Sequence, residues 1–289
     1  MQNIKNFKLL MLTIVSLHAT IHIIGCGNPS LAEIIKTGSI DNLEKALQEE
    51  SGVAMIDSMS DCCTPLILAV RYNQKDMVKL LLDKGANPYV SCYSDNVALR
   101  ESVKLGYDEI TEILITRCYG RKYDLYTNFP DTNEPRYNYL SRLGNDNYED
   151  REKSLGYALI EAAKKGQNDK VLLLLNKGAH PNIKASNNSD FGINQTTPLI
   201  AAVSNNHIKV VKMLLELGAD VNLCIRGGQL EGYRVEKSSL AEAARKGYKD
   251  IVKLLINHGA NRYILDSCGY CASDYAKENG YNDIYLLLL

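Results

Sequence analysis

The sequence of 289 residues predicts an all-α solenoid in which pairs of short helices stack one behind another. Three stretches share one pattern: TPLILAV and KLLLDKGAN within 64–87, TPLIAAV and KMLLELGADVN within 197–222, and SSLAEAARKG and KLLINHGAN within 238–261. In each stretch a small, apolar first helix ends at Gly or Asn, and an apolar second helix ends at Gly-Ala. Self-similarity at a fixed period is typical of a repeat array, so we expect one continuous array of units.

Seven residues mark where the first helix of each unit is expected to end. They are Gly38, Asn73, Gly106, Gly166, Asn206, Gly247 and Gly280, separated by 35, 33, 60, 40, 41 and 33 residues. About seven units therefore fill residues 31–289. The first unit, 30–50, lacks the Thr-Pro start, and the last unit stops at Leu289 in its second helix. Atypical end units are expected, because terminal repeats cap the array.

Each expected element has a local cause. Thr64 and Thr197 are suited to cap a first helix, and the proline after each is suited to the first helical position, where no amide hydrogen bond is lost. Small residues stand where paired helices must approach closely (Ala69, Ala162, Ala202, Ala243 and Ala276), and the second helices carry an apolar face such as Val210, Val211, Leu214 and Leu215. One unit cannot bury that face alone, so neighbouring units must complete the core.

The third unit departs most from this pattern. Val97 replaces the capping threonine, Ser102 replaces the small alanine, Thr111 interrupts the apolar face, and Cys118 stands where glycine should end the second helix. We therefore expect this unit to be the weakest layer of the array.

These segments resemble the ankyrin repeat, whose unit reads T-P-L-H-x-A, then G-H, then V-V-x-x-L-L-x-x-G-A-D, with a period of about 33 residues. The resemblance implies an ankyrin-repeat solenoid of helix–turn–helix units with connecting loops of the β-hairpin type. It also implies that another protein is the partner. In the family the His207 position usually makes a hydrogen bond within the repeat.

The first 25 residues read as an export signal: Lys5 and Lys8 precede an apolar run over 9–25, which is too short to be a membrane-spanning helix of about 20 residues. Ile23-Ile24-Gly25-Cys26 resembles the lipobox of bacterial lipoproteins. That resemblance implies a lipoprotein signal peptide at 1–25, acyl chains such as palmitate on Cys26, and a short tether at 26–30. An uncleaved anchor, or an ordinary signal cut elsewhere, are the alternatives.

Nothing in the sequence indicates an enzyme or a cofactor. The lone Cys268-x-x-Cys271 lacks the second ligand pair of a zinc site and the βαβ context of a redox pair, and Cys271 occupies a threonine position of the repeat. The pairing of Cys62 with Cys63, or of Cys268 with Cys271, stays open. A net charge of −1, with no basic block beside aromatic residues, argues against nucleic acid as a partner.

Extra residues lie only between the second helix of one unit and the first helix of the next. The longest insertion carries about 27 residues beyond the common period, too few for another unit. We expect a Tyr-rich finger at 119–152, and shorter insertions after the fourth and fifth units. Tyr and Arg dominate binding hot spots, so we predict these partner-binding residues: Tyr123, Tyr126, Phe129, Arg136, Tyr137, Tyr139, Arg226, Tyr233 and Arg234.

The sequence thus predicts a membrane-anchored scaffold that binds another protein through its concave face and inserted loops, with no small-molecule substrate. The expected location is the bacterial cell envelope or surface. One alternative is an ankyrin effector that is secreted to act on host proteins. An alternative of another class is a small redox or metal protein that uses Cys268 and Cys271.

Overall fold

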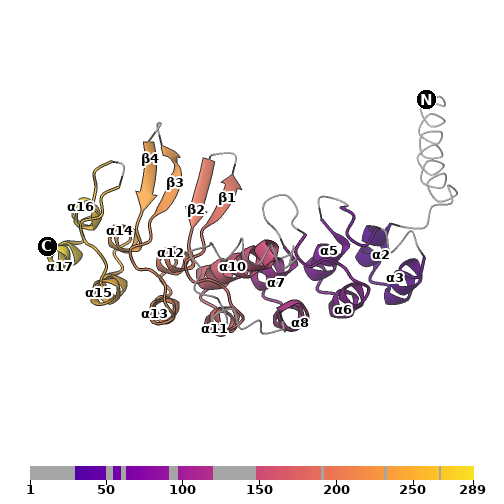
Figure 1. The fold of residues 1–289 in the computed structure, drawn as a ribbon. Coiled ribbons are helices and arrows are strands. Elements are labelled where there is room, and N and C mark those ends of the chain that lie inside the picture. The colour runs from indigo at the N-terminus through magenta and orange to yellow at the C-terminus, as the bar shows by residue number, and fades with distance from the viewer. Residues whose placement is uncertain are drawn as a thin grey trace, which may run out of the picture.

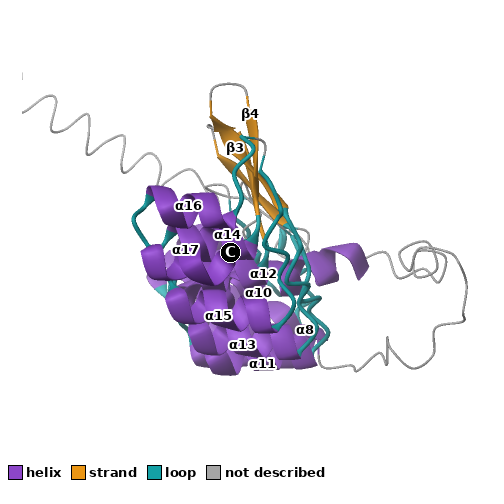
Figure 2. Cartoon of the chain, turned by 90° about the vertical axis from the view of Figure 1, so that its left-hand side faces the viewer, coloured by secondary structure: helices purple, strands orange, loops and turns teal. Residues whose placement is uncertain are grey.

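The computed structural model describes residues 30–49, 55–59, 63–90, 97–119, 148–189, 192–230, 233–266 and 268–289. Two rows of helices run along the molecule, the first helices of the units in one row and the second helices in the other (Figure 1). The two β-hairpins extend away from the helices on the side of the first row (Figures 1 and 2). The predicted all-α solenoid is confirmed.

In the described part of the chain, the helices named below form seven pairs. The pairs are α2 (Leu31–Thr37) and α3 (Ile40–Ala46), α5 (Pro65–Arg71) and α6 (Lys75–Asp83), α7 (Ala98–Leu105) and α8 (Asp108–Tyr119), α10 (Tyr148–Lys165) and α11 (Asn168–Asn176), α12 (Pro198–Ser204) and α13 (Ile208–Glu216), α14 (Ser239–Arg245) and α15 (Lys249–Asn257), and α16 (Ala272–Glu278) and α17 (Asn282–Leu288).

Hydroxyl side chains cap the first helices as the sequence predicts. The Oγ1 atoms of Thr64 and Thr197 accept hydrogen bonds from the amides three residues on, and Ser238 does the same before α14. Ser30 caps α2 in a reciprocal capping box with Glu33, so the first unit has its own start signal in place of Thr-Pro.

All seven residues marked in the sequence as first-helix ends adopt a left-handed conformation. The five glycines among them have φ between 69° and 80°, and Asn73 and Asn206 have φ of 55° and 60°. Glycine and asparagine tolerate this conformation, which releases the chain from the first helix and turns it into the second.

The core lies between the two rows and is continuous from one unit to the next. The alanines at the close-approach position are fully buried: Ala69, Ala162, Ala202, Ala243 and Ala276. Val210, Val211, Leu214 and Leu215 of α13 are buried as well, although Leu215 is the least so. Neighbouring units therefore supply the cover that a single unit lacks, as the apolar pattern predicts.

The two shorter insertions form antiparallel hairpins. β1 (Ala185–Ser189) pairs with β2 (Gly192–Thr196), and β3 (Ile225–Leu230) pairs with β4 (Tyr233–Lys237). The register of β3 and β4 shifts between Arg226 and Gln229, where a bulge interrupts the ladder. The hairpin-type connections that the resemblance implied are confirmed at these two positions.

The third unit differs as expected and adds one compensating feature. Val97 provides no side-chain cap, and α8 runs for 12 residues because Cys118 does not stop it as Gly218 stops α13 after 9 residues. Ser102 and Thr111 are buried and face each other, with 2.9 Å between their hydroxyl oxygens. Each of these two buried polar side chains therefore provides a hydrogen-bond partner for the other.

The predicted finger at 119–152 needs a correction at both ends. Tyr119 belongs to α8, and residues 148–152 form the first turn and more of α10, which has 18 residues where α12 has 7. The intervening residues, 120–147, lie outside the described part of the chain, as do the predicted signal peptide and Cys26. Among the helices that are described, none is both long enough and apolar enough to cross a bilayer.

Candidate protein-binding surface

Three of the predicted partner-binding residues lie on one hairpin. In the β3–β4 pairing Arg226 is opposite Glu236, Arg234 is opposite Gln229, and Tyr233 is opposite Leu230. The other predicted residues, Tyr123, Tyr126, Phe129, Arg136, Tyr137 and Tyr139, lie outside the described residues. The described structure therefore places only Arg226, Tyr233 and Arg234, on a hairpin that stands beyond the first-helix row (Figure 2).

The first helices carry a row of polar side chains that sequence reasoning missed. Counting five residues back from the left-handed residue that ends each first helix gives Glu33, Glu101, Glu161, Glu242 and Tyr275 in the first, third, fourth, sixth and seventh units. Glu33 is exposed and belongs to the capping box of α2. The other three glutamates, named here the glutamate row, are buried, each no more than 6% exposed. Four glutamates at one repeat position are the signal that could have revealed the row from the sequence.

Glu101 is paired with two basic side chains. Arg71 Nε of the preceding unit lies 3.0 Å from Glu101 Oε1, and Lys104 Nζ of the same helix lies 3.5 Å from Oε2. Arg71 also donates from Nη1 to Cys63 Sγ at 2.8 Å. A buried carboxylate is tolerated when it is paired and hydrogen-bonded, and Glu101 meets both conditions.

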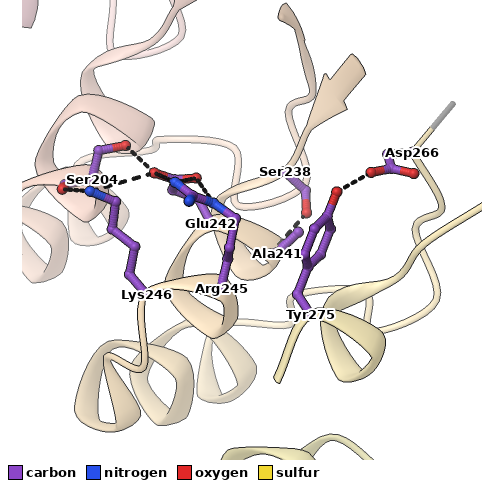
Figure 3. A network of polar contacts seen from close by, with 8 residues as sticks. All are labelled: Ser204, Ser238, Ala241, Glu242, Arg245, Lys246, Asp266 and Tyr275. Atoms are coloured by element: carbon purple, nitrogen blue, oxygen red, sulfur yellow. Dashed lines mark hydrogen bonds and ion pairs between the residues drawn. The ribbon is translucent and has the colours of Figure 1, made fainter. Parts of the chain in front are cut away.

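Glu242 has an equivalent but differently built set of partners (Figure 3). Arg245, one turn further along α14, donates two hydrogen bonds from Nη2 to the two carboxylate oxygens at 2.9 and 3.0 Å. Ser204 of the preceding unit donates to Oε1 at 3.1 Å, and Lys246 donates to the Ser204 carbonyl at 3.0 Å. The network ties the fifth unit to the sixth.

Tyr275 occupies the same position in the last unit and also has a partner. Its hydroxyl donates to Asp266 in the loop before α16 (Figure 3). Burial, followed by this hydrogen bond, raises the pKa of Tyr275 above its ordinary value.

Glu161 is different from the other members of the glutamate row. Within the described residues no hydrogen bond or ion pair involves its carboxylate, although only 6% of the residue is exposed. It lines a hollow of about 180 Å³ between α10, α12 and the base of the β1–β2 hairpin. Glu161 is therefore the member of the glutamate row that the described residues leave without an ion pair or hydrogen bond, although Arg100 and Lys164 line the same hollow.

Side chains in the loops after the second helices join neighbouring units in a repeated manner. Asn182 Oδ1 accepts from the Asp220 amide, and Asn222 Oδ1 accepts from the Asn261 amide, both at 2.7 Å. Asp57 accepts in the same way from Asn87 at 2.9 Å. These bonds fix the spacing of the units and hence the shape of the surface that they present.

His207 makes its hydrogen bond to a different unit from the one that the resemblance implied. Its Nε2 lies 3.0 Å from the Lys164 carbonyl of the preceding unit, and its ring packs over Gly166. A Cβ at Gly166 would lie 2.6 Å from the imidazole, so glycine is required there for packing as well as for its positive φ. The prediction of a bond within the repeat is therefore wrong, and the structural role of His207 is kept. His180 and His258 are exposed.

The cysteines of the last unit have a structural arrangement. Cys271 precedes α16 at the capping position, and both its amide and its thiol contact Asp274 Oδ2, at 2.9 and 3.0 Å. These hydrogen bonds lower the pKa of Asp274. Over the part of the chain that the structure describes, no three His, Cys, Asp or Glu side chains gather as a metal site would require. Cys62 lies outside that part, and Cys118 has a pKa raised to about 12 by burial.

Comparison with known families gives matches over most of the chain. A model described as ankyrin repeats in three copies matches residues 10–127 and 137–224, and one described as the ankyrin repeat matches 237–267. The first match begins inside the predicted signal peptide.

Several curated proteins are similar over part of their length. Three plant proteins, from Arabidopsis thaliana and Oryza sativa, carry E3 ubiquitin-protein ligase in their names and are 36–40% identical over 89 residues, which is 30% of this chain and 16–22% of theirs. The mouse B-cell lymphoma 3 protein homolog is 29% identical over 201 residues, 68% of this chain and 36% of its own. The chain thus spans about a fifth of the length of the plant relatives.

Two solved structures share the fold. The ankyrin repeat domain of human ASB11 is 20% identical with a TM-score of 0.58, and the match covers 90% of this chain and 98% of that one. The ankyrin repeat domain of Bcl-3 is 22% identical with a TM-score of 0.59, over 89% and 98% of the two chains. At these identities the likeness establishes the architecture alone.

Proposed function

Because the chain belongs to the ankyrin repeat family, we propose that it is a membrane-anchored scaffold that binds another protein through the face formed by its first helices and hairpins. Ankyrin repeats generally bind other proteins and are typically non-enzymatic. Fold alone does not specify a partner, so the argument rests on the surface.

The observation that carries the binding role is the placement of the two hairpins. They extend from the first-helix side as neighbouring projections, and one carries Arg226, Tyr233 and Arg234. Insertions on one face of a solenoid often mark its binding face, and Tyr and Arg provide large contact areas with polar tips. The predicted finger would add Tyr and Arg residues to the same edge.

The anchoring role rests on the sequence Ile23-Ile24-Gly25-Cys26. Several acyl chains on Cys26 would hold the protein stably at a membrane, whereas one chain would bind only weakly. Release of the protein to act on host proteins is the rival arrangement. Incorporation of radiolabelled palmitate at Cys26 supports anchoring, and its absence favours release.

The role of the finger in binding is tested by replacing residues 121–147, which end before α10, with a short Gly-Ser link. Proximity labelling in the native cell first identifies the partner, and the purified partner is then titrated against both forms of the protein. We expect the variant to keep its helical circular dichroism and to lose affinity for the partner. Unchanged affinity would assign binding to the helical face and hairpins instead of the finger.

The anchor is tested separately with Cys26→Ala, which should move the protein from the detergent phase to the aqueous phase. Cys224→Ala is a matched control, since Cys224 lies in a loop of the solenoid. A Cys26→Ala protein that stays with membranes at high salt would contradict the lipid anchor.

A further inference from the structure

The three glutamates of the glutamate row occupy one repeat position but differ in their partners. Arg71 and Lys104 neutralise Glu101, and Arg245 forms a two-point contact with Glu242. At Glu161 the residue that corresponds to Arg245 is Lys164, and no ion pair joins the two within the described residues. Lys104, one unit before, pairs with Glu101 instead. The contact that Arg245 makes with Glu242 therefore has no counterpart at Glu161 among the described residues.

The hollow at Glu161 has the form of a side-chain pocket. Its volume is about 180 Å³, and its lining includes Tyr157, Thr196 and Ser204 in addition to Glu161. Glu161 is buried, Tyr157 and Ser204 are half-buried, and Lys164 and Asn205 are exposed, so the carboxylate lies at the floor and the exposed groups lie at the rim. A group that reaches the floor must be slender, able to donate hydrogen bonds, and positively charged.

We propose that this pocket receives an arginine side chain of the protein that the scaffold binds. The inference rests on the proposed binding function and adds the chemistry of one contact to it. The Glu161 carboxylate lines the hollow, and a guanidinium can make two hydrogen bonds to one carboxylate. Arginine is favoured over lysine because its planar fork loses less freedom for each bond formed and is more weakly hydrated. The contact between Arg245 and Glu242 is the same arrangement made within the chain.

The charged side chains around the pocket indicate which residue type should stand next to that arginine in the bound protein. Arg100, whose Cζ lies 5.7 Å from the centre of the Tyr157 ring, and Lys164 also line the hollow. The ammonium of Lys164, which is exposed at the rim, attracts an anion there. The bound segment should therefore carry Asp or Glu next to its arginine.

The experiment uses the full chain and three synthetic peptides: acetyl-Gly-Arg-Glu-Gly-amide, the same peptide with citrulline for arginine, and the same peptide with Gln for Glu. Binding is followed by NMR chemical shifts in the isotope-labelled protein. We expect the Arg-Glu peptide to bind most tightly and to shift the amide signals around 157–164 and 196–205. Citrulline keeps the shape of arginine without its charge, so it should bind about tenfold or more weakly.

Two variants test the pocket itself. Glu161→Gln should weaken the Arg-Glu peptide about tenfold or more, whereas Glu112→Gln, at an exposed position of α8, should leave its binding unchanged. Lys164→Arg keeps the charge and places an arginine where Arg245 stands beside Glu242. It should raise the melting temperature and abolish peptide binding, because the pocket is then filled from within.

Equal binding of the arginine and citrulline peptides, or equal binding to the parent and Glu161→Gln, would overturn the proposal, as would a lack of binding to the parent. These peptide assays use purified components. If the native partner still binds Glu161→Gln with full affinity, the proposed scaffold function survives and only the arginine contact is lost. If the partner does not bind the solenoid at all while the peptide binds at Glu161, the scaffold function fails and the pocket remains.

Discussion

The third unit, α7 and α8, and the fifth unit, α12 and α13, have the same two-helix form but keep it by different means. The fifth unit has Thr197 as a cap, Ala202 at the close approach, Val211 on the apolar face and Gly218 as a stop. The third unit has Val97, Ser102, Thr111 and Cys118 at those positions.

The third unit is joined to its neighbours by charged side chains. Arg71 pairs with Glu101, Lys75 with Glu109, and Arg117 with Asp83 on the side of the second unit, and Lys170 pairs with Asp108 on the side of the fourth. Among the described residues, the ion pair of the fifth unit is Lys212 with Glu216, within one helix. Start and stop signals can therefore be lost from one unit when contacts with neighbouring units retain the fold.

The largest expected effect comes from removing core volume in each unit. Leu114→Ala and Leu214→Ala, at fully buried positions, should each lower the free energy of unfolding by about 2–5 kcal/mol. We expect the smaller loss at Leu114, because a less uniformly apolar layer can collapse around the cavity. Urea denaturation measures both losses, and Leu172→Ala, at a residue 42% exposed, is the control, with a change of about 0.5 kcal/mol or less. A larger loss of stability at Leu114 than at Leu214 would contradict the prediction that the third unit is the weaker layer.

The second effect concerns the helix starts. Thr197→Ala removes the hydrogen bond from the Ile200 amide and should cost about 1 kcal/mol. Val97→Thr should instead stabilise the third unit by a similar amount, because Val97 already has the extended backbone of a capping residue, with φ −99° and ψ 155°. Thermal melting reports both changes. If Val97→Thr has no effect or destabilises, the missing cap is not a cause of the difference.

The third effect concerns the hydroxyl pair of the third unit, Ser102 and Thr111, which the fifth unit replaces with apolar residues. Thr111→Val alone leaves Ser102 without the hydroxyl that faces it and should cost about 1 kcal/mol. The double variant Ser102→Ala/Thr111→Val reproduces the apolar pattern of the fifth unit and should return close to the parent stability, since both polar groups are removed together. A double-mutant cycle with no coupling energy would show that the two hydroxyls do not act as a pair.

The smallest effect is the response of the ion pairs to salt and pH. The hydrogen bond from Lys75 lowers the pKa of Glu109, and the bond to Glu109 raises the pKa of Lys75. The stabilisation that comes from the lowered pKa of Glu109 is fully present above the ordinary value of 4.5 and is lost as the pH falls through the lowered pKa. The stabilisation that comes from the raised pKa of Lys75 is fully present below 10.5 and is lost as the pH rises through the raised pKa. The pair should therefore act between these limits.

Hydrogen exchange checks this prediction and the order of opening. Amides of 98–119 should exchange faster than those of 198–216, and high salt should speed the first segment more than the second, because exposed pairs are screened. Equal protection of the two segments at low salt would contradict the expected weakness of the third unit. An equal response to salt would remove the role given to the ion pairs.

The repeat itself could be predicted from the sequence in detail, because its signals are local. A residue with left-handed backbone must end each first helix, and only glycine and asparagine stand at those seven positions, including Asn73 and Asn206. The start of α10 was missed because the whole excess over the repeat period was assigned to a loop, although Asn147 is a suitable capping residue and Glu149, Arg151 and Lys153 favour a helix.

The pocket at Glu161 could not be predicted in the same way. Its open state depends on which acid each neighbouring lysine contacts, and Lys104 and Lys164 stand at equivalent positions with different outcomes. The bond from His207 to the preceding unit is likewise a matter of spacing between units. Both features arise from how successive units are placed, which a local pattern does not specify.

The short reach of the contacts between units has a consequence for how the chain folds. The hydrogen bond from the Asn87 amide to Asp57 spans 30 residues, and the one between His207 and Lys164 spans 43. Chains whose contacts are close in sequence fold quickly, because little loop entropy must be lost before each contact forms. The early units can thus assemble on the ribosome before the later ones are synthesised, and each new helix pair finds a finished surface on which to dock.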